Sequence, residues 1–402
     1  MARFTLPRDI YHGKGCLEEL KNLKGKKAFL VVGGGSMKRQ GFLDKAVNYL
    51  KEGGMEVEVF EGVEPDPSVE TVMRGAEAMR KFEPDWIVSM GGGSPIDAAK
   101  AMWAFYEYPE TTFEDLITPF SFPELRQKAK FAAIPSTSGT ATEVTAFSVI
   151  TNYQTGVKYP LADFNITPDV AIVDPDLVMG LPVKQVAYTG MDALTHAIEA
   201  YIGRSTTKQT RKAAIEAIQL IFQYLPVAYK NGKNRTARKE MLRASYLAGT
   251  AFTKSYVGYV HAVAHSLGGQ YGIPHGLANS VLLPIVLEAY GSAAHKKLAH
   301  LARITKLSSS PDDTTAANAF IAHIRKMNAS MNIPTTLAGI RNEDIPKLAR
   351  YADKEANPLY PVPILWDDKQ LALMYHLVQE KKEKENNSHA ETGHRDYTGI
   401  SA

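Results

Sequence analysis

The sequence predicts an α/β domain built on a parallel sheet, followed by an all-α domain. Apolar strand runs alternate with helical runs over the first half, and two of these strands break into glycine-rich turns, Gly33 to Ser36 and Gly91 to Ser94. Strand-like runs nearly vanish past Pro182, where helical patterns take over. Repetition of strand, glycine turn and helix is typical of a parallel open sheet. We therefore expect one domain over residues 1–181 and a second over residues 182–380.

The strands expected in the first half are short apolar runs bounded by turn residues. They are Lys27 to Val32, Met55 to Phe60, Trp86 to Met90, Phe131 to Ile134 and Val170 to Val173. Helical periodicity predicts helices from Phe42 to Lys51 and from Ile96 to Phe105. Pro95, just before the second of these, suits the first turn of a helix.

The sequence pattern of the second half predicts helices separated by short polar segments. They are Asp192 to Tyr201, Lys208 to Tyr224, Thr236 to Thr253, His261 to Tyr271 and Ser292 to Thr305. Residues 381–402 are polar and charged, which predicts a flexible tail.

Composition bounds the class of protein. The chain has 402 residues, of which 45% are hydrophobic and 22% charged, as in a soluble globular protein. The net charge of +3, from 46 basic and 43 acidic residues, does not argue for a nucleic-acid or membrane partner, and we expect neither. Cys16 is the single cysteine, which fits a reducing cytosol. No apolar run is long enough for a bilayer, since Val281 to Leu287 is short and contains Pro284. We expect a cytoplasmic protein.

The two glycine turns are candidate phosphate cradles. A glycine turn between a strand and a helix lets backbone N–H groups approach an anion, and the helix N-terminus adds partial positive charge. Neither turn is G-x-G-x-x-G or a Walker A loop, and a tight structural turn is the alternative for each. Together with the hydroxyl-rich segment Ser136 to Thr140, they favour a Rossmann-like, dinucleotide-binding domain.

A second set of residues has the spacing of metal ligands. Asp192 and His196 lie four apart, so on a helix they share one face. His261 on another helix and His275 at a turn could complete a four-ligand set. Three neutral imidazoles and one carboxylate around a divalent ion leave a net charge near +1, which suits an alkoxide. The alternative is that these are separate packed or surface histidines.

Five motifs resemble the iron-containing (group III) alcohol dehydrogenases. They are GGGSPIDAAKAM from Gly91, IPSTSGTATEVT from Ile134, KYPLAD from Lys158, MDALTHAIEAY from Met191 and GYVHAVAHSLGGQYGIPHGLAN from Gly258. The resemblance, over residues 3 to 375, includes NADPH-dependent butanol dehydrogenases and the alcohol dehydrogenase half of aldehyde-alcohol dehydrogenases. It implies the dehydroquinate synthase-like architecture, an α/β dinucleotide-binding domain before a helical metal domain.

The resemblance also implies roles for individual residues. The family's metal ligands match Asp192, His196, His261 and His275 without substitution. Its cofactor contacts match a larger set, with the pyrophosphate at the first three of them: Gly92, Gly93, Ser94, Asp97, Thr137, Ser138, Thr140, Lys158 and Leu177. His265 matches a residue near the nicotinamide.

The cofactor prediction depends on the segment from Gly33 to Arg39. NAD-preferring relatives carry an aspartate where this chain has Gly34, and that charge would repel a 2′-phosphate. Here Gly34 and Gly35 open space, Ser36 offers a hydroxyl, and Lys38 and Arg39 supply cations. We expect NADP(H), with NAD(H) as the alternative if the two cations are only solvated surface charges.

The predicted reaction is hydride transfer between a small primary alcohol or aldehyde and the nicotinamide. A divalent ion would acidify the alcohol and polarise the carbonyl. Fe(II) is expected from the family, although Zn(II), Co(II) and Ni(II) suit the same ligands. His265 is the candidate proton relay, and a purely structural His265 is the alternative.

Several alternatives stay open at this stage. Glycerol dehydrogenases and dehydroquinate synthase share the architecture, and a metal-free binding protein could keep the fold without turnover. Aromatic residues near Phe147, Phe252 and the His261 helix suggest a pocket between the domains for an apolar substrate such as butanol or butyraldehyde. The family commonly forms dimers, and an edge strand near Arg3 to Ile10 could pair across a two-fold axis.

Overall fold

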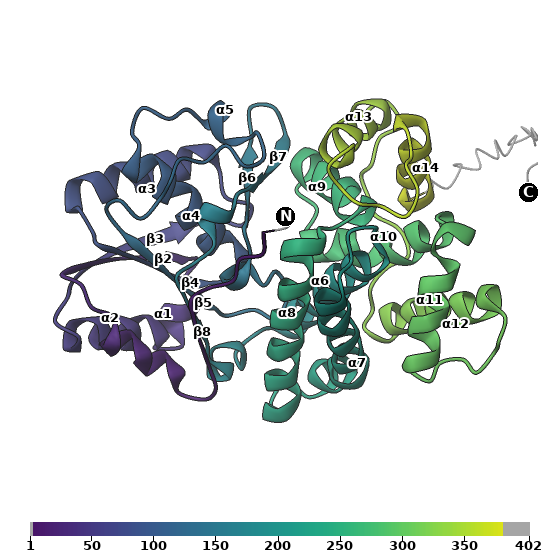
Figure 1. Ribbon diagram of the computed structural model, residues 1–402, viewed down its shortest axis with the longest axis horizontal. Helices are drawn as coiled ribbons and strands as arrows, with labels where there is room; N and C mark the ends of the chain where they lie inside the picture. Colours follow the sequence, from purple (N-terminus) through teal and green to yellow (C-terminus); the bar gives the residue numbers. More distant parts are fainter. Residues whose placement is uncertain (1–2, 381–402) are drawn as a thin grey trace, which may run out of the picture.

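The computed structural model describes residues 3–380 and has two halves side by side (Figure 1). A parallel sheet flanked by helices forms one half, and a stack of helices forms the other. The predicted fold class is confirmed. The prediction for residues 381–402 lies outside the described residues.

Within residues 3–380, six strands form one parallel sheet in the order β1-β8-β5-β4-β2-β3. The strands are β1 (Asp9–His12), β2 (Lys27–Gly33), β3 (Glu56–Val63), β4 (Trp86–Gly91), β5 (Lys130–Pro135) and β8 (Val170–Val173). All five predicted strands are present. β4 and β8 are buried throughout, as expected for strands covered on both faces.

The described part of this half contains five α-helices, two of which start at the glycine turns. They are α1 (Ser36–Arg39), α2 (Phe42–Glu52), α3 (Val69–Phe82), α4 (Gly93–Glu107) and α5 (Phe113–Leu116). α4 begins at Gly93, directly after β4, so its free N–H groups lie at the carboxyl edge of the sheet. It is buried over most of its length because it packs against the sheet and a hairpin.

That antiparallel hairpin, β6 (Phe147–Asn152) and β7 (Val157–Ala162), is not among the predicted strands. Pro160 lies inside β7, and proline in an apolar run argues against a central strand. The hairpin is a separate two-stranded sheet, in which that proline is tolerated.

The helical half is confirmed and is more extensive than predicted. Its helices are α6 (Val183–Ile202), α7 (Lys208–Lys230), α8 (Arg235–Ser255), α9 (Tyr259–Tyr271), α10 (His275–Ala289), α11 (Ser292–Ile304), α12 (Asp313–Ser330), α13 (Ile345–Ala356) and α14 (Asp368–Val378). The last strand of the main sheet ends at Val173, and α6 begins at Val183.

The prediction that His275 lies at a turn was wrong. His275 is the first residue of α10, and the turn precedes it, because Gly272 ends α9 in the left-handed conformation with φ +65°. The apolar run containing Pro284 belongs to the same helix. α10 lacks a polar stripe because it is buried among other helices, so its sequence carries no amphipathic period.

The N-terminal strand differs from the prediction in position. It begins at Asp9 rather than near Arg3 and pairs in parallel with β8 at the edge of the sheet. No single helix within residues 3–380 has the length and apolar composition needed to cross a bilayer. α10 and α11 meet these two requirements only when taken together, and the pair is bent by 115°.

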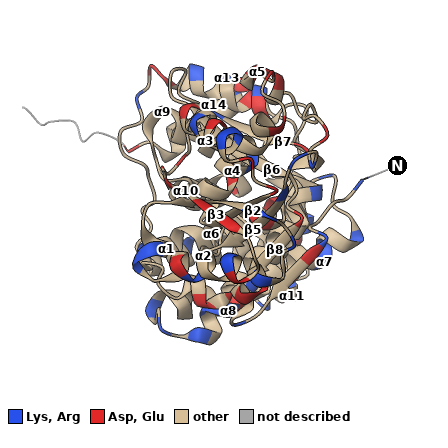
Figure 2. Ribbon diagram, turned by 90° about the vertical axis from the view of Figure 1, so that its left-hand side faces the viewer, with Lys and Arg blue, Asp and Glu red and all other residues tan. Residues whose placement is uncertain are grey.

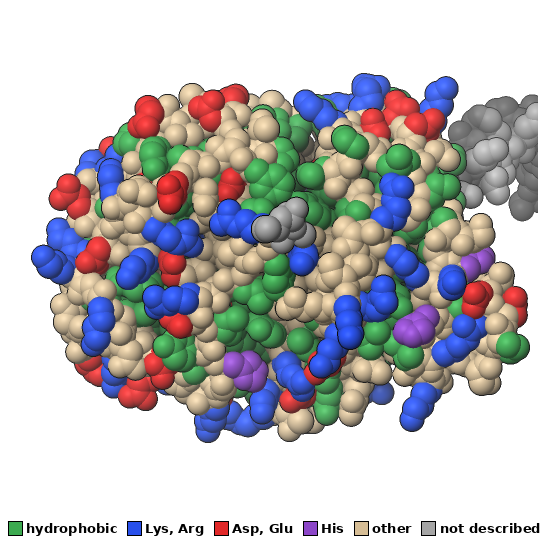
Figure 3. Space-filling view, viewed as in Figure 1, with side chains coloured by type: hydrophobic (Ala, Val, Ile, Leu, Met, Phe, Trp, Pro, Cys, Tyr) green, Lys and Arg blue, Asp and Glu red, His purple; other side chains and the backbone are tan. Residues whose placement is uncertain are grey.

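Charged side chains are mixed over the described surface. Lys and Arg alternate with Asp and Glu along the α/β half (Figure 2), and the face in Figure 3 shows the same scattering. No field of one sign covers either view, in line with the nearly balanced composition.

Gly276, in the first turn of α10, fixes how closely this helix approaches α6. A Cβ at this position would lie 2.4 Å from the carbonyl oxygen of Tyr188. We predict that Gly276→Ala lowers the free energy of unfolding by about 1–3 kcal/mol, because a backbone atom must move. Urea denaturation measures this, with Gly34→Ala as the control, since no atom lies within 4 Å of a Cβ at Gly34. Equal stability of both variants would contradict the close-contact argument.

Candidate active site

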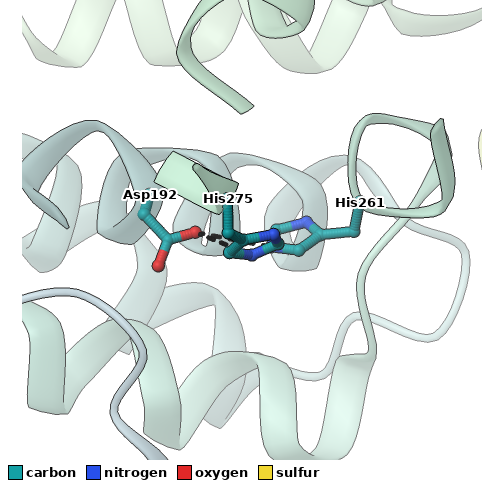
Figure 4. A group of neighbouring side chains, drawn as sticks. All are labelled: Asp192, His261 and His275. Atoms are coloured by element: carbon teal, nitrogen blue, oxygen red, sulfur yellow. Dashed lines mark ion pairs between the residues drawn. The ribbon is translucent and has the colours of Figure 1, made fainter. Parts of the chain in front are cut away.

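Three side chains from three helices converge in the helical half. Asp192 of α6, His261 of α9 and His275 of α10 bring their ligand atoms within 4.8 Å of one another (Figure 4). Asp192 Oδ1 lies 3.7 Å from His261 Nε2 and 3.4 Å from His275 Nε2. Ligands about 2.1 Å from an ion stand roughly 3.4 Å apart in a tetrahedral site. The spacing therefore fits a metal ion.

His196, the fourth predicted ligand, borders this cluster but lies outside its closest group. Its Nδ1 is 3.9 Å from Asp192 Oδ1 and is buried without a hydrogen-bond partner. Its ring stacks on Phe252, with centroids 4.1 Å apart, and on His261 at 4.4 Å. A buried imidazole nitrogen without a partner is costly, so an ion would satisfy it.

The charge states of Asp192 and His196 suit metal ligands, whereas His261 must lose a proton before it can bind an ion. Burial acts to raise the pKa of Asp192, but its electrostatic and hydrogen-bond interactions with the surrounding histidines hold it well below its usual value. Burial lowers the pKa of His196 to about 3, which keeps it neutral. Burial also opposes protonation of His261, but its hydrogen bonds to Asp192 and Glu199 raise its pKa to about 9. Metal binding at His261 therefore releases a proton.

Two further residues orient the ligands, and the sequence analysis missed both. Glu199 accepts from the backbone N–H of Val260 at 2.8 Å and pairs with His261 Nδ1 at 2.6 Å, which leaves Nε2 for the ion. Asn279 Nδ2 donates to Asp192 Oδ1 at 2.8 Å. The spacing held a signal for each, since Glu199 follows His196 on the same helical face and Asn279 follows His275 by one turn.

A cleft leads from the glycine turns to the metal cluster. Its inner cavity is lined by Gly93, Ser94, Asp97, Thr140, Lys158, His196, His261, His265 and His275, among others. Its outer cavity is lined by Gly34, Gly35, Ser36, Lys38, Gly92, Thr137 and Leu177. Ser94 lines both cavities, so they adjoin at this residue. Of the predicted cofactor residues, Ser138 lines neither; it is buried and lines a separate small cavity with Leu181 and Val186.

The middle of the cleft is a narrow backbone cradle at the N-terminus of α4. A Cβ at Gly93 would lie 2.8 Å from Thr140 Cγ2, so only glycine fits this approach. Ser94 Oγ accepts from the backbone N–H of Asp66 at 3.3 Å, and Asp66 Oδ1 pairs with the buried Lys158 Nζ at 2.7 Å. Unpaired helix N–H groups and a nearby ammonium suit an anionic ligand.

Asp97 is fixed by its own partners beneath this cradle. Its carboxylate accepts from Thr142 Oγ1 at 2.6 Å and from the backbone N–H of Val149 at 3.1 Å. Burial raises the pKa of Asp97 to about 6, against the opposing charge of Lys100. The buried Lys100 Nζ donates to the carbonyl oxygens of Thr142, Thr145 and Phe147, so α4 is fastened to the hairpin that walls the cleft.

His265 faces the inner cavity and is held from behind by α13. Its Nδ1 lies 2.8 Å from Glu355 Oε1, which also accepts from the hydroxyl of Tyr360 at 2.8 Å. Glu355 and Tyr360 were not predicted from the sequence, because no spacing connects them to His265 across this distance in the chain. Phe147 and Phe252 line the same cavity, as predicted.

The chain belongs to the iron-containing alcohol dehydrogenase family, and it is therefore an oxidoreductase of that class. Residues 7–175 match the family description "Iron-containing alcohol dehydrogenase", and residues 186–376 match "Fe-containing alcohol dehydrogenase family, C-terminal". Among its relatives is the NADPH-dependent butanol dehydrogenase of Clostridium saccharobutylicum, 58% identical over 337 residues, which cover 84% of this chain and 86% of the relative.

Other relatives show the range of this family. The bifunctional aldehyde-alcohol dehydrogenase of Escherichia coli K12 is 39% identical, covering 90% of this chain and 45% of the longer relative. The fold matches the crystal structure of a 1,3-propanediol oxidoreductase with a TM-score of 0.88 at 36% identity, over 94% of this chain and 99% of that one. An iron-containing alcohol dehydrogenase from Thermococcus thioreducens matches with a TM-score of 0.82 at 32% identity, over 93% and 98%.

We predict that Asn279→Leu weakens metal binding about 10- to 100-fold, because the Asp192 carboxylate loses the donor that orients it. The dissociation constants of Fe(II) and Zn(II), measured by chelator competition, test this. The control is Asn328→Leu, which removes another buried amide that donates to the backbone oxygen of Ser280 and makes no hydrogen bond to a ligand. Equal metal affinity of Asn279→Leu and the wild type would contradict the orienting role.

Proposed function

We propose that this protein interconverts small primary alcohols and aldehydes by hydride transfer to or from NADP(H), with Fe(II) held by Asp192, His196, His261 and His275. The observation that carries the proposal is the ligand cluster at the inner end of a cleft that starts at a glycine turn. Zn(II) is the alternative metal, since three imidazoles and a carboxylate bind it as well. When bound, the divalent ion supplies Lewis acidity toward the substrate oxygen.

The cofactor lies along the cleft in this proposal. The pyrophosphate contacts Gly92, Gly93 and Ser94 at the α4 N-terminus, and the adenosine end occupies the outer cavity beside Gly34, Gly35, Ser36 and Lys38. Asp97, Thr137, Thr140, Lys158 and Leu177 complete the contacts. Ser138, which was also predicted, lines neither cavity. The name of the Clostridium relative supports NADPH over NADH.

The substrate binds in the inner cavity against an apolar wall. Phe147, Val149, Phe252 and Val257 line the cavity beside the histidines. Apolar surface next to a polar centre suits a short alkyl chain with one oxygen, such as butanol or butyraldehyde. A diol is the second candidate, favoured by the 1,3-propanediol dehydrogenase of Citrobacter freundii, which is 40% identical over 388 residues.

His265 exchanges the alcohol proton in this proposal. Because Glu355 engages Nδ1, Nε2 is the nitrogen left to accept a proton on alcohol oxidation and to donate it on aldehyde reduction. Glu355 is a positioning residue that fixes the ring and its tautomer. A structural His265 is the alternative reading, which mutation separates.

We also propose that residues 1–181 and 182–380 are two domains, and that the protein is a cytoplasmic homodimer. A single cysteine supports a reducing compartment. The parallel strand β1 at the edge of the sheet supports a dimer, since its outer side is open to pairing.

The first experiment measures anaerobic butyraldehyde reduction by Fe(II)-loaded protein, with NADPH and NADH compared side by side. We expect turnover with a preference for NADPH. A preference for NADH would overturn the cofactor assignment alone. Absence of turnover with butyraldehyde at full metal occupancy, together with turnover of 1,3-propanediol or glycerol, would assign the enzyme to polyols.

His265→Gln should lower kcat for butyraldehyde reduction about 100-fold, since the proton loses its relay, while metal content stays at the wild-type level. Wild-type kcat for His265→Gln would assign it a structural role.

Glu355→Gln should lower kcat about tenfold with little change in KM, because the ring of His265 loses the carboxylate that orients it. Glu343→Gln, which changes an exposed carboxylate just before α13, serves as control.

A further inference from the structure

The outer cavity contains an acidic residue that the cofactor proposal does not use. Glu61 lies near the carboxyl end of β3 and lines the cavity together with Gly34, Gly35 and Ser36. Its Oε1 and Oε2 lie 3.0 Å and 3.2 Å from Lys38 Nζ. The cation expected to attract a 2′-phosphate is therefore already paired with a carboxylate.

The charge of this cavity depends on that pair. Among the described residues that line it, Lys38 and Glu61 are the only ones with charged side chains. A cavity with Lys38 alone would favour an anion, whereas the pair leaves it neutral. Both side chains are partly exposed, at 59% and 46%, so either can turn away from the other when a ligand enters.

The position of Glu61 resembles that of a ribose-reading carboxylate in strand–glycine turn–helix–strand units, although here the pyrophosphate is assigned to the other glycine turn, at Gly92 to Ser94. In such units an acidic residue at the end of the second strand accepts a hydrogen bond from the 2′-hydroxyl of the adenosine ribose. Here β2 is the first strand, Gly33 to Ser36 make the turn, and β3 is the second strand, paired with β2 in parallel. Glu61 is thus at the corresponding edge of the sheet.

We propose that Glu61 helps to set the cofactor preference, because its ion pair with Lys38 competes with the 2′-phosphate for that cation. A 2′-phosphate must take Lys38 away from Glu61 and then lie beside a carboxylate of the same sign. An unphosphorylated ribose offers its 2′-hydroxyl to Glu61 and leaves the ion pair intact. Glu61 therefore makes the preference for NADP(H) over NAD(H) smaller than it would be if only the space beside Gly34 and Gly35 and the charge of Lys38 decided it. This inference rests on the proposed dinucleotide site.

The test measures nucleotide binding without turnover. Isothermal titration calorimetry of the Fe(II)-loaded protein gives Kd for ADP-ribose and for its 2′-phosphorylated form. We expect Glu61→Gln to raise the selectivity for the phosphorylated form roughly tenfold, by removing a repulsion and a charged acceptor for the hydroxyl. Glu58→Gln, an exposed change of the same kind on the same strand, should leave the selectivity unchanged. Lys38→Gln should weaken the binding of the 2′-phosphorylated nucleotide more in the Glu61→Gln background than in the wild type.

The outcomes separate this inference from the proposed function. Unchanged selectivity in Glu61→Gln, with both nucleotides bound, overturns the role of Glu61 and leaves the dehydrogenase proposal standing. Reduced selectivity for the phosphorylated form overturns it as well, because Glu61 would then assist the phosphate. Absence of binding of either nucleotide to the wild type overturns the nucleotide site itself, and the inference with it. Unchanged thermal midpoints of the variants confirm that they fold.

Discussion

The geometry of the site depends on the convergence of α6, α9 and α10 around the Asp192 carboxylate. A buried anion needs compensation, and the histidines and the Asn279 amide supply it from three different helices. The close approach of α10 to α6 at Gly276 brings His275 into that set. Glu199 completes it by fixing His261 through its other nitrogen. The helical half is thus organised around a charge that a divalent ion would balance.

The α/β half contributes the cleft that ends at this cluster. Parallel strands direct their carboxyl ends to one edge, where the glycine turns leave backbone N–H groups free. Lys100 of α4 donates to carbonyl oxygens at the start of the hairpin and in the segment before it. These bonds hold the wall of the cleft against the helix whose N-terminus forms the phosphate cradle. A ligand that spans both cavities therefore contacts elements of both halves.

Much of this could be predicted from the sequence, because the signals were local. The strands between glycine turns and the amphipathic helices carry their periods in short windows, and Asp192 and His196 sit one turn apart. α10 was not predicted because a largely buried helix has no polar stripe. β7 was not predicted because Pro160 lies inside it. Glu355 and Tyr360 could not be found, since only tertiary packing brings them to His265. Glu61 was hidden for the same reason, because its pair with Lys38 joins β3 to α1, 23 residues away in the chain.

The central claim is that one metal ion binds at the inner end of a dinucleotide cleft. Anomalous diffraction at the iron edge, from crystals grown anaerobically with Fe(II) and NADP(H), tests it most directly. We expect a single anomalous peak enclosed by Asp192, His196, His261 and His275. Nucleotide density should run from that peak past Ser94 to Lys38. A peak elsewhere, or nucleotide density outside this cleft, would contradict it.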